Sequence, residues 1–443
     1  MASSKYINDQ RREYSLFVLH HRAIPLICDG LKSAARRVLW TARDGKKYKS
    51  ATLAGATMPI HPHASPESSV NTLAAHYGNN VPLLIGYGAF GTMLDPTAYG
   101  ASRYTSVKIS KFCKDVLFRD IEIIPMIENY DSTLMEPEYF LPLVPLVLLN
   151  PSEGIAVGFA SSILPRDLSN IINAQIRILE GKKLKDEPAP TFLPTKSVAV
   201  KNEGKWEFRG EFDRINSTTI RVTKLPYGLL HSKFDDYLTK LKDREEILDS
   251  NDGSRDYIDI EIKFKRGSLD KDDDVVLKQL NLINSVNENL NVINFDGNNV
   301  LSTNFNDLVT CFTEWRLGWY KTRYERLQRL LEEDIQKFMD IKIAIEKNVG
   351  GTVRKIKSRS ELKDYLEAIK IVNIDYIADL PVYRFTEEEY KKVKDKIADS
   401  LKTLAEYKKL ISSENERKTI YIKELKEIKK NYEAGAYNQD NKE

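Results

Sequence analysis

The stretch Ala101-Ser102-Arg103-Tyr104-Thr105, followed by Lys108, Lys111 and Lys114, carries the most information in this sequence. An arginine beside one of 22 tyrosines says little alone, but this pair stands within an ordered series of motifs. Upstream lie Arg22-Ala23-Ile24-Pro25, Asp29-Gly30-Leu31-Lys32, Arg36-Arg37-Val38-Leu39, His61-Pro62-His63 and Gly86-Tyr87-Gly88-Ala89-Phe90-Gly91, and downstream lies Gly154-Ile155-Ala156-Val157-Gly158. We therefore interpret the pair through the order and spacing of the whole set.

The composition is that of a folded, multidomain protein. A chain of 443 residues is too long to fold around one ordinary hydrophobic core, so two to four domains are expected. Hydrophobic residues make up 42% and charged residues 30%, no apolar run approaches a membrane span, and the first dozen residues are polar. Cys28, Cys113 and Cys311 are isolated thiols, which argues against disulfides or a zinc site and predicts a cytoplasmic protein.

The charge is unevenly distributed along the chain. The net charge is only +3, yet residues 1–120 contain 16 Lys and Arg against 8 Asp and Glu. A basic N-terminal third on a nearly neutral protein is typical of a polyanion partner such as nucleic acid, although a solvated basic face would look the same.

Two short helices are predicted in this basic third. Apolar residues in Leu31–Arg43 recur at helical spacing, with Asp29 placed as the N-cap and with Lys32, Arg36 and Arg43 on other faces. A second helix should begin at Ser65-Pro66-Glu67, which has a capping serine and a proline at the first helical position. Such a pair suits a helix-turn-helix or winged-helix module.

An α/β region is predicted from about 190 to 305. Residues 257–264 and 219–222 alternate between apolar and polar, as half-buried strands do. Asp296-Gly297 predicts a hairpin turn, and segments at about 231–248 and 272–286 have helical patterns.

The last third predicts long helices. Apolar residues recur every three or four positions from Tyr320 to Ile345, before Gly350-Gly351, which should end the helix. Another helix begins at Thr386, where Thr386 and Glu389 form a capping box. Two long helices around a compact segment at about 356–383 predict an antiparallel coiled coil, with ordinary bundle helices as the alternative.

Three motifs have more than one interpretation. The GxGxxG series at 86–91 could bind a nucleotide, but no helix can open at Thr92-Met93-Leu94-Asp95-Pro96, so a tight glycine turn is favoured. His61-Pro62-His63 could bind a metal, but no other ligand stands at suitable spacing, so contact with phosphate is favoured. The acidic run 270–274 is better explained as a helix start than as a metal site.

Arg103 and Tyr104 could perform phosphoryl-transfer chemistry. A phenol with a pKa of ~10 is a poor nucleophile at neutral pH, so it needs nearby positive charge or a metal. Arg103 would supply planar, bidentate contacts to a phosphate. A phosphotyrosine ester conserves the energy of the bond it replaces, which suits a reversible cut. The alternative is a surface tyrosine beside a basic patch.

The ordered motif set resembles the breakage-reunion (gyrase A-like) subunit of type IIA DNA topoisomerases, and most closely the medium subunits of T-even-type phage enzymes. The resemblance implies an α+β multidomain fold. Its expected parts are a winged-helix DNA-cleavage domain (1–150), an α/β tower (151–305), a coiled coil with a helical dimer gate (306–434) and a disordered tail (435–443).

The same resemblance implies roles for single residues. Tyr104 matches the tyrosine that forms the 5′-phosphotyrosine link, and Arg103 matches the arginine that stabilises the transition state. Ile155 matches an isoleucine that wedges between base pairs. The residues expected to grip DNA are Arg22, Lys32, Arg36, Arg37, His61 and His63, and Lys108 from the basic run joins them as a candidate.

This sequence departs from the family pattern at several places. His-Pro-His-Gly-Asp-Ser continues here as His63-Ala64-Ser65-Pro66, so the quinolone-contact residues are not recognisable. The glycine series lacks the usual amides, and Ala35 replaces a histidine in the basic helix.

No ATPase or acidic metal-binding motif is present, so Mg²⁺ and ATP are expected to come with an ATPase/TOPRIM partner subunit. We expect a homodimer that relaxes and decatenates DNA in the cytoplasm, of the host cell if phage-encoded. The alternative is a non-enzymatic, DNA-bending architectural protein.

Overall fold

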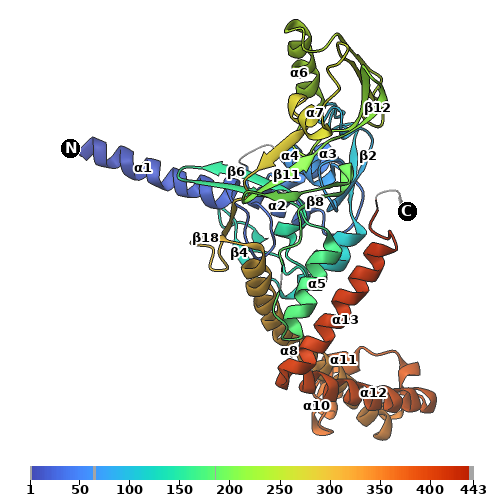
Figure 1. Ribbon diagram of the computed structural model, residues 1–443. Coiled ribbons are helices and arrows are strands. Elements are labelled where there is room, and N and C mark those ends of the chain that lie inside the picture. Colours follow the sequence, from blue (N-terminus) through green and yellow to red (C-terminus); the bar gives the residue numbers. More distant parts are fainter. Residues whose placement is uncertain (1, 63–65, 185, 439–443) are drawn as a thin grey trace. The chain divides into compact units, whose positions relative to one another are not determined.

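A computed structural model describes residues 2–62, 66–184 and 186–438 (Figure 1). The chain divides into two compact units, one comprising Met1–Arg316 and Ile422–Glu443 and the other Leu317–Tyr421. Among the described residues, no helix combines the length and the apolar character needed to cross a membrane.

Three helices and a small sheet form a winged-helix module in the first unit. The helices are α2 (Ser33–Thr41), α3 (Ser50–Thr57) and α4 (Pro66–Ala74). The antiparallel sheet has the order β1 (Tyr48–Lys49), β3 (Ser106–Ile109) and β2 (Leu84–Tyr87). Their inner side chains are completely or almost completely buried, among them Val38, Leu39, Leu53, Val70 and Val107. The two helices predicted from the sequence are thereby confirmed, while the predicted capping residue Ser65 lies outside the described residues.

The predicted cap of the first helix is wrong. α2 begins after Lys32, which makes no side-chain capping bond. Asp29 instead lies completely buried, and its carboxylate accepts hydrogen bonds from the backbone N–H groups of Leu31 and Phe140 and from Arg36. The carboxylate is used by tertiary partners, which a sequence pattern does not reveal.

The other elements of this part of the first unit are short helices and hairpins around a core that includes Phe140, Leu141 and Leu148. They are α1 (Ala2–Val18), the π-helical turns η1 (Leu19–Ala23) and η2 (Cys113–Leu117), the 3₁₀ turns η3 (Ile121–Ile123) and η4 (Leu146–Leu148), the strand pairs β4 (Met126–Glu128) with β5 (Met135–Pro137), β6 (Ser152–Ala156) with β7 (Phe159–Ile163) and β17 (Leu290–Ile293) with β18 (Val300–Thr303), and helix α5 (Leu168–Leu179). The hairpin predicted at Asp296-Gly297 is confirmed, and Gly297 has the positive φ of +71° that favours glycine.

The predicted α/β region contains two antiparallel sheets and two helices. One sheet has the order β12 (Glu211–Asn216), β13 (Thr219–Lys224), β15 (Ile260–Lys263) and β14 (Asp249–Asp252), and the other has the order β10 (Val200–Asn202), β11 (Lys205–Arg209) and β16 (Ile283–Val286). A small pair, β8 (Thr191–Phe192) and β9 (Ser197–Val198), flanks the turn η5 (Leu193–Thr195). Helices α6 (His231–Asp243) and α7 (Asp273–Gln279) complete the region.

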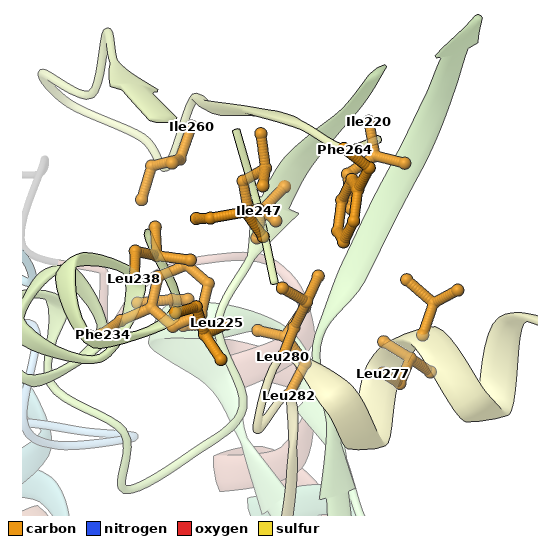
Figure 2. Close-up of a cluster of buried hydrophobic side chains, with 14 of the residues drawn as sticks. Ile220, Leu225, Phe234, Leu238, Ile247, Ile260, Phe264, Leu277, Leu280 and Leu282 are labelled. Carbon is orange, nitrogen blue, oxygen red and sulfur yellow. The ribbon is translucent and has the colours of Figure 1, made fainter. Parts of the chain in front are cut away.

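The core of this region joins the first sheet to both helices. Phe234 and Leu238 of α6, Leu277 of α7 and strand residues such as Ile260 belong to one buried cluster, in which Figure 2 shows Ile260 on the side of α6 and Leu277 on the opposite side. The helix expected over 272–286 is shorter than predicted, because the left-handed residue Asn281 (φ +55°) ends it and residues 283–286 form a strand.

The second unit is helical. It contains most of α8 (Phe305–Glu346), the short helices and turns α9 (Val349–Thr352), η6 (Val353–Lys355), α10 (Arg359–Ala368), α11 (Ile374–Ala378) and η7 (Val382–Phe385), helix α12 (Glu387–Ser412) and the start of α13 (Glu414–Glu433). Tyr390 donates a hydrogen bond to Glu346, while the Tyr407 ring lies 5.5 Å from the Tyr324 ring. A residue near the start of α12 thus contacts the end of α8, and a residue later in α12 contacts an earlier part of α8, so the two helices are antiparallel.

Two predictions about the ends of these helices have different outcomes. Thr386 caps α12 by accepting from the backbone N–H of Glu389, which is one half of the predicted capping box, while the Glu389 carboxylate pairs with Arg384 and Lys392. Gly350 and Gly351, in contrast, do not terminate α8, since both lie inside α9. Asn348 (φ +50°) is the left-handed residue at the boundary.

The predicted disordered tail begins at residue 435. Residues 435–438 form a turn in the structure, because the Tyr437 ring packs edge-on against Phe112 and its hydroxyl reaches Asp115. Residues 439–443 lie outside the described residues.

Candidate functional site

Tyr104 lies on a short loop that is fixed on both sides by α3 and α4. The backbone N–H of Ala51 donates to the carbonyl of Ser102, and the Thr105 hydroxyl donates to the Ser50 hydroxyl at 2.7 Å. The Ser102 hydroxyl donates to Glu67 of α4. Tyr104 itself is 70% exposed, so a well-anchored loop presents the phenol to solvent.

Two cations accompany Tyr104. The Arg103 guanidinium lies over the tyrosine ring, with Cζ 4.8 Å from the ring centroid. Lys49 donates from Nζ to the backbone carbonyl of Tyr104 at 3.3 Å. Sequence reasoning missed Lys49, although the basic run from Arg43 to Lys49 was a signal for it. The arrangement places one cation against the ring and one against the backbone of an accessible tyrosine.

The glycine-rich turn supports this loop from the other side. Gly88 and Gly91 have φ of +101° and +87°, conformations that favour glycine. Phe90 bridges to Tyr99, and the backbone N–H of Gly100 donates to the carbonyl of Ala89. No helix opens after Gly91, so the turn lacks the geometry of a dinucleotide site and serves as a packed turn.

The two neighbouring arginines of the basic helix α2 are each paired with a carboxylate. Arg36 donates to both carboxylate oxygens of Asp29, at 2.6 and 2.9 Å, and is only 8% exposed. Arg37 makes the same bidentate contact with Glu136, at 2.5 and 3.0 Å. The interpretation of these two arginines as direct grips on DNA is not supported by their positions, because buried carboxylates already hold both guanidinium groups.

Arg22 and Lys32 line a hollow of about 400 Å³ beside α4. Lys32 donates from Nζ to the backbone carbonyl of Glu153 at 2.6 Å. The Nη2 atom of Arg22 is buried and has no hydrogen-bond partner among the described residues. The polar side chains Ser68, Ser69 and Thr72 of α4 form part of the wall. This hollow is thus suited to an anionic ligand.

The β6–β7 hairpin carries Ile155, which is 85% exposed. Its base is fixed by Gly154, where a Cβ atom would stand 1.8 Å from the carbonyl oxygen of Ala23. Its tip turns at Val157-Gly158, with Gly158 at φ +81°. The hairpin therefore presents a large apolar side chain to solvent from a rigid base, close in sequence to the hollow that Glu153 lines.

Comparison with known proteins identifies the family. The family model for the A subunits of DNA gyrase and topoisomerase IV matches residues 22–426. This chain belongs to that family.

Several relatives of this gyrase/topoisomerase IV family member are informative. The chain is 29% identical to the DNA topoisomerase medium subunit of Enterobacteria phage T4, over 96% of this chain and 98% of that protein. It is 26% identical to the A subunit of Chlamydia trachomatis DNA gyrase over 94% of its length, but spans only 54% of that protein.

A solved structure has the same fold. It is the DNA-binding, cleavage and re-ligation domain of Plasmodium falciparum topoisomerase II, with a TM-score of 0.82 and 21% identity over 94% of this chain and 63% of that one. The predicted mixed fold of winged helix, α/β region and long helices is therefore confirmed.

The remaining candidate residues of this gyrase/topoisomerase IV family member are dispersed. The His61 ring lies 5.5 Å from the Tyr130 ring and 6.4 Å from the Phe17 ring, and partial removal from water lowers its pKa. His63 lies outside the described residues. Lys108 lines a different hollow with Lys111, Lys114 and Tyr437. The structure therefore joins Arg22 and Lys32 but does not join Lys108 to them.

The acidic run 270–274 forms a helix start in this family member. Asp272 is the N-cap of α7, while Asp273 and Asp274 pair with Arg214 and Arg209. Within the part of the chain that the structure describes, no three His, Cys, Asp or Glu residues are arranged to hold a metal ion.

Proposed function

We propose that this chain is the DNA-cleaving and religating subunit of an ATP-dependent type II DNA topoisomerase, with Tyr104 as the nucleophile and Arg103 as its catalytic partner. The single observation that carries the proposal is the exposure of Tyr104 on a hydrogen-bonded loop. The Arg103 guanidinium lies over the Tyr104 ring. Membership in the family of gyrase and topoisomerase IV A subunits supports the class of reaction.

The proposed chemistry is a transesterification. The Tyr104 oxygen attacks the scissile phosphorus, the P–O3′ bond breaks, and the 3′-oxygen leaves with a proton as a free hydroxyl. A 5′-phosphotyrosine link remains, and attack by the same hydroxyl restores the duplex. Arg103 stabilises the extra negative charge of the pentavalent phosphate.

The positions of two candidate residues support DNA contacts: Arg22 and Lys32 hold backbone phosphates in the hollow beside α4. For His61, His63 and Lys108, the proposed contact with DNA rests on the sequence motifs alone. Ile155 inserts between base pairs, because an exposed apolar side chain on a rigid hairpin can unstack and bend a duplex. Arg36 and Arg37 position α2 through Asp29 and Glu136 rather than touching DNA.

The partners of the proposed reaction lie outside this chain. We propose that an ATPase/TOPRIM subunit binds ATP and supplies Mg²⁺, which would polarise the scissile phosphate. Two copies of this chain associate through the helical gate within residues 306–434. In the sequence this region follows the winged-helix (1–150) and tower (151–305) domains. The complex relaxes and decatenates DNA rather than supercoiling it, in the cytoplasm of a cell or of a phage's host.

Trapping of a covalent adduct tests the proposal. The chain is reconstituted with its ATPase/TOPRIM subunit, Mg²⁺ and plasmid, and protein–DNA adducts are trapped with detergent. Tyr104→Phe should abolish the adduct while DNA binding persists, and Tyr99→Phe, at a 53% exposed tyrosine nearby, is the matched control. A purely DNA-bending architectural protein would give no adduct in any variant, and an adduct in Tyr104→Phe would overturn the assignment.

A further inference from the structure

The hollow beside α4 contains a polar side chain that the sequence motifs did not single out. His21 of η1 lines it together with Arg22 and Lys32. Among the described lining residues the one acid is Glu153, and its backbone carbonyl already accepts from Lys32. The hollow therefore combines two cations, a histidine and the hydroxyls of α4.

Two contacts fix the orientation of the His21 ring. Its Nδ1 lies 3.1 Å from the hydroxyl oxygen of Ser33, the first residue of α2, and its face lies 4.8 Å from the Phe17 ring. Ser33 is itself only 8% exposed. The second ring nitrogen, Nε2, has no hydrogen-bond partner in the part of the chain that is described.

We propose that His21 is a further DNA-contact residue, whose Nε2–H donates a hydrogen bond to a phosphate oxygen of the duplex held in the hollow. The Ser33 hydroxyl donates to Nδ1 and so keeps the ring proton on Nε2. Arg22, which lines the same hollow, has a buried Nη2 atom with no hydrogen-bond partner among the described residues. The inference rests on the proposed function, since it assigns a contact to the DNA of that reaction.

His21 acts as an uncharged donor. Removal from water, and then the positive charges of Arg37, His20, Arg36 and His61, lower its pKa to about 4. The imidazole is therefore neutral at pH 7. Ala35 of α2 lines the same hollow, so a histidine placed there would face the same ligand. His21 thus supplies from η1 the donor that α2 lacks.

Equilibrium DNA binding of the reconstituted complex tests this contact, measured across a range of salt concentrations in a Tyr104→Phe background. His21→Phe keeps the ring packing against Phe17 but removes the donor, and should weaken binding by about tenfold, as for a lost hydrogen bond to a charged group. His21→Gln retains a donor and should bind within about threefold of the parent. His76→Phe, at a histidine outside the hollow, should not differ from the parent.

The salt dependence separates a hydrogen bond from an ion pair. His21→Phe should leave the slope of log K against log salt unchanged, whereas Lys32→Ala should reduce its size by about 0.9, the value for one lost phosphate contact. Adding Ala35→His to His21→Phe should restore part of the lost affinity. Parental affinity in His21→Phe, equal losses in His21→Phe and His21→Gln, or a slope change of about one in His21→Phe would each overturn the proposal.

The same complex with Tyr104 intact keeps the two proposals separate. If it forms no covalent adduct, the proposed cleavage function fails. If it forms the adduct and His21→Phe binds DNA as the parent does, only the His21 contact fails.

Discussion

The Arg36 guanidinium holds the Asp29 carboxylate through two hydrogen bonds of 2.6 and 2.9 Å, in an ion pair that is almost completely buried. Asp29 also fixes the backbone at Leu31 and Phe140, so the pair joins the start of α2 to a distant segment of the core. This relationship gives Arg36 a structural role inside a helix that otherwise looks like a DNA-binding surface.

Arg36→Ala should therefore destabilise the protein by about 3–5 kcal/mol, because it leaves a buried carboxylate without its partner. Urea denaturation measures the change, and Arg12→Ala, at an exposed position on α1, is the control. Unchanged stability together with a loss of DNA affinity would instead make Arg36 a direct DNA contact.

Gly154→Ala should disrupt the β6–β7 hairpin. The new Cβ would stand 1.8 Å from the Ala23 carbonyl oxygen, so the backbone must move. Gly55→Ala is the matched control, because Gly55 lies in α3 with open space around it, and alanine there should stabilise the helix by about 0.5–1 kcal/mol. Thermal unfolding of both variants measures the contrast, and equal melting temperatures would contradict the close approach.

Ile155→Ala should abolish the bending of bound DNA without changing stability, since the side chain is 85% exposed. Energy transfer between dyes at the two ends of a short duplex reports the bend. Val157→Ala, at a neighbouring residue that is 75% exposed, is the control and should bend DNA as the parent does. If Ile155→Ala still bends DNA, the proposed insertion of Ile155 between base pairs is wrong.

The three cysteines should differ in reactivity. Burial raises the pKa of all three thiols, but Cys28 and Cys113 are completely buried whereas Cys311 is exposed and open to a reagent. Native protein should thus incorporate one equivalent of an alkylating reagent near neutral pH, and urea-unfolded protein three. Mass spectrometry identifies the labelled peptide, and early labelling of Cys28 or Cys113 would contradict the packing around them.

Local signals explain why much of the fold is predictable. The proline of α4, the Asp296-Gly297 turn and the Thr386 cap act within a few residues of themselves, and all three are where the sequence places them. Gly350 and Gly351 misled the prediction because a glycine permits a helix end without requiring one, and Asn348 supplies the left-handed residue instead.

The environment of the site could not be predicted in the same way. Arg37 meets Glu136, 99 residues away, and His21 shares a hollow with residues of α4 and with Glu153. Only tertiary packing decides that both arginines of α2 are paired with carboxylates while Lys32 remains beside the hollow. The sequence could identify Tyr104 and its neighbours as candidates, but not which cations are held inside the fold.

Mapping the covalent adduct tests directly whether Tyr104 is the residue that becomes linked to DNA. The complex with Mg²⁺ is trapped on a duplex that is labelled on the strand whose 5′-phosphate becomes linked to the protein. The trapped complex is digested with nuclease and trypsin, and the peptide that carries the nucleotide is sequenced by mass spectrometry. We expect a 5′-phosphonucleotide on Tyr104. A nucleotide attached to another residue, or joined through a 3′-phosphate, would contradict it.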